Sequence, residues 1–309
     1  MVLTEAGPGT ATFTMPATGW LLPPPGFLQL GALAILADGA LGGAIQTALP
    51  AATPYTTSDL SMSFLRPALA DGGTLVARGR VIHAGRSLAL SDVTVDDGGS
   101  RLLAHGTSRC FVLPPISPPP LPPMESAPVQ PPTYGTPDPY LRPVIGESLI
   151  QDVWDRMTGL EVLRALAAGD LPAPPITHLT GLRVVEAEEG TSTFVLPASA
   201  WLCSPAGTVE GGAISLLADT ALATAVQTTL PRRTAYTPLD LKVNYLRPVF
   251  PDGRDLVARA RVIHRGRTLA VASAELENAD GKPVAVATGT TFVREGRPWR
   301  GGAAGSPGG

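Results

Sequence analysis

Two carboxylates stand inside unusually apolar stretches of the chain. Asp38 lies within residues 28–49, and Asp219 follows the glycine pair Gly211-Gly212. Both stretches are typical of helices that are apolar nearly all round, which indicates burial at the centre of a fold. Burial of a carboxylate costs free energy, and desolvation raises its pKa towards that of a useful general base or nucleophile. We therefore expect these acids to have a functional role, although a structural aspartate that was duplicated with its domain would give the same pattern.

The two acids belong to a duplicated sequence, because a displacement of 181 residues aligns Asp38 with Asp219. The same displacement aligns, without a gap, residues 9–13 with 190–194, 20–21 with 201–202, 65–67 with 246–248, 80–86 with 261–267 and 111–112 with 292–293. Two copies of about 110 residues are too long and too few for a solenoid. We expect two tandem domains that pack as an intramolecular pseudo-dimer.

Glycines at the helix starts supply the other half of the chemistry. A glycine there lets a ligand approach the backbone, and the unpaired N–H groups with the helix dipole stabilise a developing oxyanion. Gly211 and Asp219 are eight residues apart, about 12 Å along one helix, so they cannot serve the same carbonyl. Each acid is therefore expected to work with the turn that begins the helix of the other repeat.

Proline marks the boundary between the repeats. A proline-rich run cannot form a helix or a central strand and serves as an extended spacer. The apolar spacing of residues 148–168 is helical, with Ser148 as a cap, and residues 172–175 end that helix. The expected organisation is a first domain over 1–113, a linker over 114–146, a helix plus second domain over 147–296, and a disordered tail over 297–309.

The remaining pattern is that of strands. Apolar and polar residues alternate in 240–246 and 257–262, as in half-exposed antiparallel strands. In the second repeat we expect strands at 182–188, 191–197, 236–246, 255–264, 268–278 and 283–293, with hairpin turns at 278–281 and, in the first repeat, 96–99. The predicted fold class is α+β, with a long central helix wrapped by an antiparallel sheet in each domain.

Composition excludes several classes of protein. The 309 residues are 44% hydrophobic and 16% charged, with a net charge of −3 and no basic block, so neither nucleic acid nor an acidic membrane surface is an expected partner. Cys110 and Cys203 form no metal or redox motif, and residues 1–8 are not a signal peptide, which favours a cytoplasmic protein. Residues 28–49 could span a bilayer by length, but Asp38 would cost about 2.5 to 3.5 kcal/mol at its centre.

Four segments of the second repeat, 201–212, 217–219, 240–248 and 262–267, together resemble hotdog-fold acyl-CoA thioesterases of the PaaI-like group. The resemblance covers nearly all of both repeats. In that family the segment before the helix typically reads Asn-Pro-x-Gly-x-x-His-Gly-Gly. The resemblance implies that Asp219 is a catalytic acid, that the Gly211 N–H polarises the thioester carbonyl, and that sites lie between protomers.

The two expected sites are unequal. Site one joins Asp38 to Ser204, Glu210, Gly211 and Gly212, and site two joins Asp219 to Pro23, Gln29, Leu30 and Gly31. Glu210 and Gln29 replace the family histidine, and Ser204 and Pro23 replace the family asparagine. The Leu30 side chain would crowd the approach that glycine permits. We expect site one to be active and site two to be doubtful or vestigial. Glu210 either orients water or caps its helix.

Other candidates follow from the resemblance. Thr56 and Thr237 precede the strand that in the family often offers a hydroxyl to the carboxylate, although a plain strand-start threonine has the same appearance. Arg86, Arg265 and Arg267 adjoin the turn where the family often contacts CoA phosphates, and Arg suits phosphate by charge and geometry. Exposed turn arginines are the alternative.

These residues predict a thioester hydrolase that acts on acyl-CoA or a carrier-linked thioester. Water attacks with help from Asp38, the Gly211 N–H holds the oxyanion, and neither a cofactor nor a metal is expected. A non-hydrolytic protein that binds acyl thioesters or other hydrophobic ligands is an alternative, as is a hotdog dehydratase or other lyase. A lyase of this kind would be expected to have a histidine facing the acid, and the sequence shows none at motif spacing. Pairing of two pseudo-dimers into a larger assembly is left open.

Overall fold

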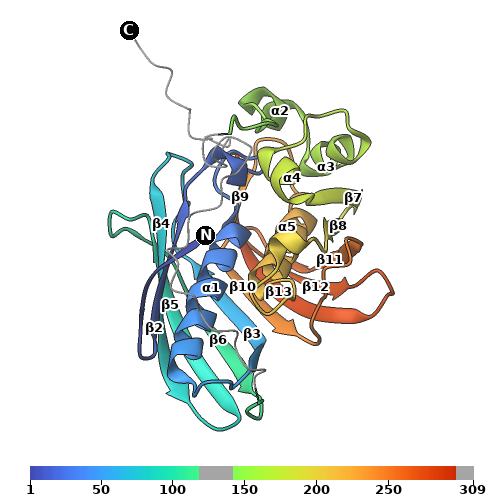
Figure 1. Ribbon diagram of the computed structural model, residues 1–309. Coiled ribbons are helices and arrows are strands. Elements are labelled where there is room, and N and C mark those ends of the chain that lie inside the picture. The colour runs from blue at the N-terminus through green and yellow to red at the C-terminus, as the bar shows by residue number, and fades with distance from the viewer. Residues whose placement is uncertain (118–141, 297–309) are drawn as a thin grey trace.

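A computed structural model describes residues 1–117 and 142–296 and shows two similar halves (Figure 1). The first half contains strands β1 (Val2–Gly7) and β2 (Thr10–Pro16), helix α1 (Leu30–Ala48), and strands β3 (Tyr55–Phe64), β4 (Thr74–Ala84), β5 (Leu88–Asp96) and β6 (Leu102–Val112). The second contains β7 (Arg183–Glu188), β8 (Thr191–Pro197), α5 (Gly211–Gln227), β9 (Ala235–Pro238), β10 (Asp240–Tyr245), β11 (Asp255–Arg265), β12 (Leu269–Glu277) and β13 (Pro283–Arg294). Most of the predicted linker, and the predicted tail at 297–309, lie outside the described residues.

One antiparallel sheet runs through both halves. Its strand order is β1-β2-β4-β5-β6-β3-β10-β13-β12-β11-β8-β7, with β9 paired to β13 off this path. The halves join where β3 pairs with β10, from Ser63 opposite Asp240 to Asp59 opposite Asn244. The predicted α+β class is therefore confirmed, and the sheet is continuous across the two repeats.

Helices α1 and α5 lie side by side against the sheet (Figure 1). Each helix meets the sheet on one side and its partner helix on another, which explains why both sequences are apolar nearly all round. By length and composition α1 could also cross a membrane. Its side chains Leu33, Leu36 and Leu41 are fully buried within the protein core, as in the central helix of a folded domain.

The two helices approach each other closely at one glycine each. A Cβ on Gly31 would lie 2.7 Å from the Leu216 Cα, and a Cβ on Gly212 would lie 2.5 Å from the Ile35 Cα. No larger residue fits at either position without separating the helices. The second residue of each turn is therefore glycine for a packing reason.

The predicted single helix over residues 148–168 is wrong. The chain forms α2 (Gln151–Arg156), α3 (Gly159–Ala168) and, beyond the prolines, α4 (Pro175–Thr180). A capping box starts α3, with the Glu161 N–H donating to Thr158 Oγ1 at 3.2 Å and the Thr158 N–H donating to Glu161 Oε2 at 2.7 Å. Ser148 caps no helix, because its hydroxyl donates to the Pro23 carbonyl at 3.0 Å.

The predicted strand over residues 236–246 is two strands. Within the described part of the chain β9 pairs with β13 alone, whereas β10 pairs with both β13 and β3. β9 ends at Pro238, because proline has no N–H to donate to a neighbouring strand. The chain then enters β10, which lies where the two halves of the sheet join. The two predicted hairpin turns are confirmed, with Gly98 and Gly281 at positive φ.

Candidate functional site

Each buried acid lies at the N-terminus of the helix from the other repeat. The Gly212 N–H donates to Asp38 Oδ2 at 2.8 Å, and the Gly31 N–H donates to Asp219 Oδ2 at 2.9 Å. The structure therefore brings the residues together across the repeats, as the spacing argument requires. The catalytic roles of these residues stay predictions.

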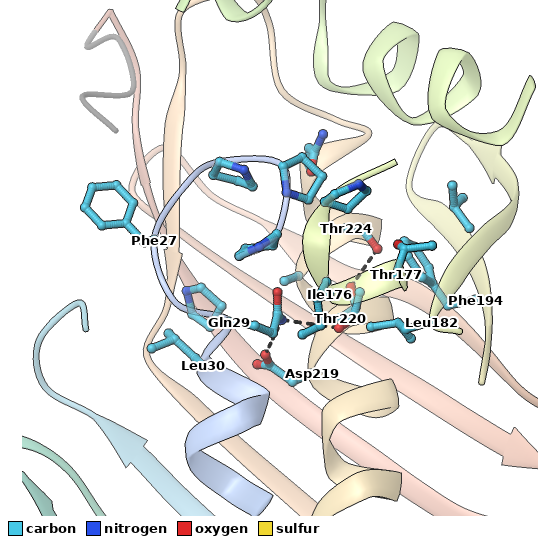
Figure 2. A pocket seen from close by; sticks show the side chains of 18 of the residues that line it. Phe27, Gln29, Leu30, Ile176, Thr177, Leu182, Phe194, Asp219, Thr220 and Thr224 are labelled. Atoms are coloured by element: carbon cyan, nitrogen blue, oxygen red, sulfur yellow. Dashed lines mark hydrogen bonds between the residues drawn. The ribbon is translucent and has the colours of Figure 1, made fainter. Parts of the chain in front are cut away.

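Asp219 is the more deeply buried of the two, with 2% of its surface exposed. Gln29 donates from Nε2 to Asp219 Oδ2 at 2.9 Å and to Thr220 Oγ1 at 3.2 Å (Figure 2). Among the described residues none donates to Asp219 Oδ1, so this oxygen is free to accept a hydrogen bond from a ligand or a water molecule. Burial raises the pKa of Asp219 to about 6, against the hydrogen bonds from Gln29 and Gly31 that lower it. The group can act as a general base near neutral pH.

The helix N-terminus beside Asp219 offers a free donor. Leu30 is the first residue of α1, and within the described part of the chain its backbone N–H has no acceptor. The helix dipole adds partial positive charge at this end. Leu30 therefore retains the main-chain donor that the first glycine of a Gly-Gly pair would supply, and the residue is buried, with 8% of its surface exposed.

A cavity of about 240 Å³ opens onto Asp219, Gln29 and Leu30. Its lining is mostly apolar and comes from both repeats and from the segment that joins them. The main contributions are the 23–30 loop, one face of α5, strands β7 to β9, and α3 and α4. Figure 2 shows Phe27 and Leu30 on one side of the carboxylate and Ile176, Leu182 and Phe194 on the other. An apolar pocket with a few convergent polar groups is the usual form of a ligand site.

The Asp38 site contains a second acid in place of the Gln29 amide. Burial, followed by the charge of Asp38, raises the pKa of Glu210 to about 7. Burial raises the pKa of Asp38 to about 6, against the Gly212 hydrogen bond. The Tyr245 hydroxyl donates to the Gly211 carbonyl at 2.8 Å and hydrogen-bonds Ser215 at 2.8 Å. A tyrosine thus packs against the turn that was expected to receive the substrate.

The side chains of the first repeat pack closely on the helix that carries Asp38. Where α5 presents Thr220, Ala223 and Thr224 to the cavity, α1 has glycine at all three equivalent positions, 39, 42 and 43. A Cβ on Gly39 would lie 2.9 Å from the Met1 side chain, and a Cβ on Gly43 would lie 2.9 Å from Phe13. Met1 and Phe13 therefore lie against the face of α1 that corresponds to the cavity-lining face of α5.

Several predicted site residues are not brought to a carboxylate. Ser204 Oγ accepts from the Ala206 N–H at 3.3 Å within its own turn. Thr237 lines the cavity but has no hydrogen bond to Asp219 in the described structure, and Thr56 is exposed on β3. The expected role of Pro23 is limited to lining the cavity.

The three candidate arginines lie away from the cavity lining. Arg86 and Arg267 are exposed at hairpin turns, and Arg265 pairs with Glu295 at 3.2 Å. Their charge and exposure are compatible with a phosphate, and their contact with CoA stays a prediction.

The sequence interpretation missed the contribution of the segment between the repeats. Leu163 and Leu166 from α3 and Ile176 from α4 line the cavity, as do Phe194 and Tyr236. One signal was available: the pocket-facing positions of the two long helices are glycine in one repeat and threonine or alanine in the other. No local sequence pattern predicts that α3 and α4 lie against the cavity.

Both repeats match a known protein family. The family described as the thioesterase superfamily matches residues 26–104 and 206–285, one segment in each repeat. A protein of Halobacterium salinarum that is described as a candidate esterase is 35% identical over 123 residues, which cover 37% of this chain and 80% of that protein.

Solved structures share the tandem arrangement over almost the full chain. The tesB protein of Mycobacterium avium subspecies paratuberculosis has a TM-score of 0.60 at 14% identity, covering 94% of this chain and 95% of its own. An acyl-CoA thioesterase II of Mycobacterium marinum has a TM-score of 0.56 at 12% identity, covering 95% of this chain and 96% of its own. At these identities the likeness shows the fold, two hotdog domains in one chain.

Proposed function

Because this chain belongs to the thioesterase superfamily, a family of thioester hydrolases, we propose that it hydrolyses an acyl thioester at the Asp219 site. One observation carries the proposal: a buried carboxylate with an open oxygen, an unpaired helix N-terminal N–H and an apolar cavity meet at one place. The substrate is acyl-CoA or a carrier-linked thioester, and the two repeats act as an intramolecular pseudo-dimer.

The reaction needs a base, an oxyanion donor and a proton for the leaving group. Asp219 Oδ1 takes a proton from water as the water oxygen forms a bond to the thioester carbon. The carbonyl oxygen becomes an oxyanion, and the Leu30 N–H with the dipole of α1 stabilises it. The C–S bond then breaks, the thiolate takes the proton from Asp219, and the products are a carboxylic acid and a free thiol.

Gln29 takes the place of the family histidine as a positioning residue. Its amide donates to Asp219 Oδ2, which fixes the carboxylate and leaves Oδ1 towards the substrate. An amide neither gains nor loses a proton in this pH range, so the proton transfers fall to Asp219. The Leu30 side chain does not remove the oxyanion donor, because that donor is the backbone N–H.

Asp219 is preferred to Asp38, which reverses the ranking expected from the sequence. Asp38 has the intact Gly-Gly turn, but Glu210 lies near it and Met1, Phe13 and Tyr245 pack around its helix or turn. Asp219 has the cavity that an acyl group needs. The cavity therefore favours the Asp219 site, although the turn beside it has Leu30 in place of the first glycine.

The experiment that tests this function separates hydrolysis from binding. The protein is incubated with octanoyl-CoA and benzoyl-CoA, and free thiol is measured. Calorimetry with the corresponding thioether, which cannot be hydrolysed, measures binding alone. We expect catalytic release of thiol from at least one thioester. Binding of the thioether without any release of thiol would instead establish a ligand-binding protein.

A further inference from the structure

We propose that α3 and α4 act as an acyl-length ruler, which makes the enzyme selective for hydrophobic acyl groups of about eight to ten carbons. In this proposal Leu163 of α3 stands at the closed end of the acyl cavity and decides where the chain must stop. The inference rests on the proposed thioesterase function at Asp219. It assigns a substrate class and a role to a segment that belongs to neither hotdog repeat.

The length of the cavity follows from the helix along which it runs. Asp219, Thr220, Ala223, Thr224 and Gln227 line it, and their spacing places them on one face of α5. Asp219 and Gln227 are eight residues apart, which is about 12 Å along the helix. Carbon–carbon bonds are about 1.5 Å long, so an extended chain advances roughly 1.3 Å per carbon and about nine carbons span this distance.

The volume of the cavity gives an independent estimate of acyl size. A cavity of about 150 Å³ lined by apolar side chains binds benzene, which has six carbon atoms. The cavity beside Asp219 is about 240 Å³, and in proportion it holds about ten carbon atoms. Length and volume therefore agree on the same class of acyl group.

The far end of the cavity is closed by tightly packed residues. Leu163, Gln227 and Tyr236 have exposed fractions of 2%, 4% and 7%. The Tyr236 hydroxyl donates to Gln227 Oε1 at 2.5 Å, and Gln227 Nε2 donates to the Gly159 carbonyl at 3.3 Å. These bonds satisfy polar groups that would otherwise disfavour an acyl chain. The close contact of Gly159 with Gln227 holds α3 against the end of α5, since a Cβ on Gly159 would lie 1.9 Å from the Gln227 carbonyl oxygen.

The segment is hydrogen-bonded to the loop of the first repeat that forms the near wall of the cavity. The Leu149 N–H donates to the Pro24 carbonyl at 2.8 Å, and the Ile176 N–H donates to the Leu22 carbonyl at 3.2 Å. In Figure 1 the three helices gather over one end of α5. Among residues 1–117 and 142–296 there is one such segment for two repeats, and it covers the Asp219 site.

The test measures kcat/KM for thiol release from saturated acyl-CoAs of four to sixteen carbons. We expect kcat/KM to rise roughly fourfold for each methylene that fits the cavity. It should pass through a maximum at eight to ten carbons and then fall, because a longer chain meets the closed end and cannot place its carbonyl beside Asp219. Leu163→Ala should move the maximum to chains longer by two to four carbons. Ala223→Leu, which fills the cavity from the α5 side, should move it to shorter chains.

Val162→Ala is the matched control for Leu163→Ala. Val162 is the adjacent residue of α3 and is fully buried, but it does not line the cavity. Its truncation should lower stability to a similar degree and leave the preferred length unchanged. The proposal is overturned if the parent cleaves sixteen-carbon and eight-carbon thioesters equally, or if both alanine variants shift the maximum together.

Binding distinguishes failure of this inference from failure of the proposed function. If no thioester is cleaved, the proposed function is wrong, and calorimetry with fatty acids of four to sixteen carbons then tests the ruler alone. Tightest binding at eight to ten carbons, moved to longer chains by Leu163→Ala, would support it. Affinity that does not depend on length in this way would contradict it.

Discussion

At the scale of single residues, the two acids are equivalent in sequence and differ in their neighbours. Burial raises the pKa of both Asp38 and Asp219 to about 6. Asp219 has the neutral donor Gln29 beside it, whereas Asp38 has the acid Glu210. The first arrangement favours the ionised base, and the second opposes it.

The pH dependence of hydrolysis follows from the pKa of Asp219. The base must be ionised, so kcat/KM should fall as the pH is lowered through about 6 and reach a plateau above about 7. A steady-state profile from pH 4.5 to 8.5 on one acyl-CoA measures this midpoint. A rate that is constant across pH 5 to 7 would contradict a carboxylate base with this pKa.

Exchanging the acid and the amide between the two turns tests the role of Gln29. Gln29→Glu places a like charge beside Asp219 and removes a hydrogen bond, both of which raise the pKa of Asp219. We expect the midpoint of the pH profile to move upwards by one unit or more, which lowers kcat/KM at pH 7 about twofold for a one-unit shift and about tenfold for a two-unit shift. Glu210→Gln makes the reciprocal change in the other repeat and should leave the profile where it is. Equal effects of the two substitutions would show that Gln29 is not specifically coupled to the base.

At the scale of elements, the pair of long helices holds the site. The resemblance assigned a catalytic role to the Gly211 N–H, and the general argument assigned the glycines at the helix starts to ligand approach. The structure gives Gly31 and Gly212 a packing role, because each lies against the backbone of the partner helix. Their N–H groups also hold the carboxylates, so helix packing and carboxylate position are coupled.

Replacing these glycines should lower stability. A Cβ on Gly212 would lie 2.5 Å from the Ile35 Cα, so Gly212→Ala must separate α1 from α5. We expect a loss of about 1 to 3 kcal/mol in the free energy of unfolding, measured by urea or thermal denaturation. Gly39→Ala is the control in α1. Its Cβ would lie 2.9 Å from the flexible end of Met1 and at an ordinary contact distance of 3.5 Å from Phe13, and better helix propensity offsets the contact. Equal destabilisation by both would argue against close helix packing at Gly212.

Elements also show where local sequence was sufficient and where it was not. The strands, the hairpin turns at Gly98 and Gly281 and the two long helices follow from periodicity and turn residues that are local in the chain. The capping box at Thr158 and Glu161 was also local and would have divided the predicted helix at residue 158. The break between β9 and β10 depends on a change of partner strand at the seam, which no local pattern encodes.

At the scale of the whole molecule, the repeat and one distance along a helix were sufficient to predict which acid meets which turn. The choice between the two sites could not be predicted in the same way. It depends on Met1, Phe13 and Tyr245 packing around one acid and on α3 and α4 covering the other. These contacts join residues far apart in the chain.

The buried acids should make the stability of the whole molecule depend on pH. Asp38 and Asp219 have pKa values raised to about 6 from 3.8, so the folded state binds more protons than the unfolded state between these values. The stabilisation is fully present below about pH 4 and is lost as the pH rises through about 6. Above pH 7 each acid is expected to lower the free energy of unfolding by on the order of 1 to 3 kcal/mol, relative to its contribution at low pH.

The double variant Asp38→Asn/Asp219→Asn isolates this contribution. Asparagine can still accept from the Gly31 and Gly212 N–H groups and carries no charge. We expect the variant to be more stable than the parent at pH 8 and to lose the decline between pH 4 and pH 7. Parallel stability curves for the two proteins would mean that these carboxylates do not titrate on folding.

The central claim is that one of two homologous acids performs the hydrolysis, and the pair of single variants tests it most directly. Asp219→Asn and Asp38→Asn are compared with the parent for thiol release from the acyl-CoA that the parent cleaves fastest. We predict a fall in kcat/KM of about 10² to 10⁴ for Asp219→Asn and a change of less than about threefold for Asp38→Asn. Loss of activity with Asp38→Asn and retention with Asp219→Asn would contradict the account and place catalysis at the other site.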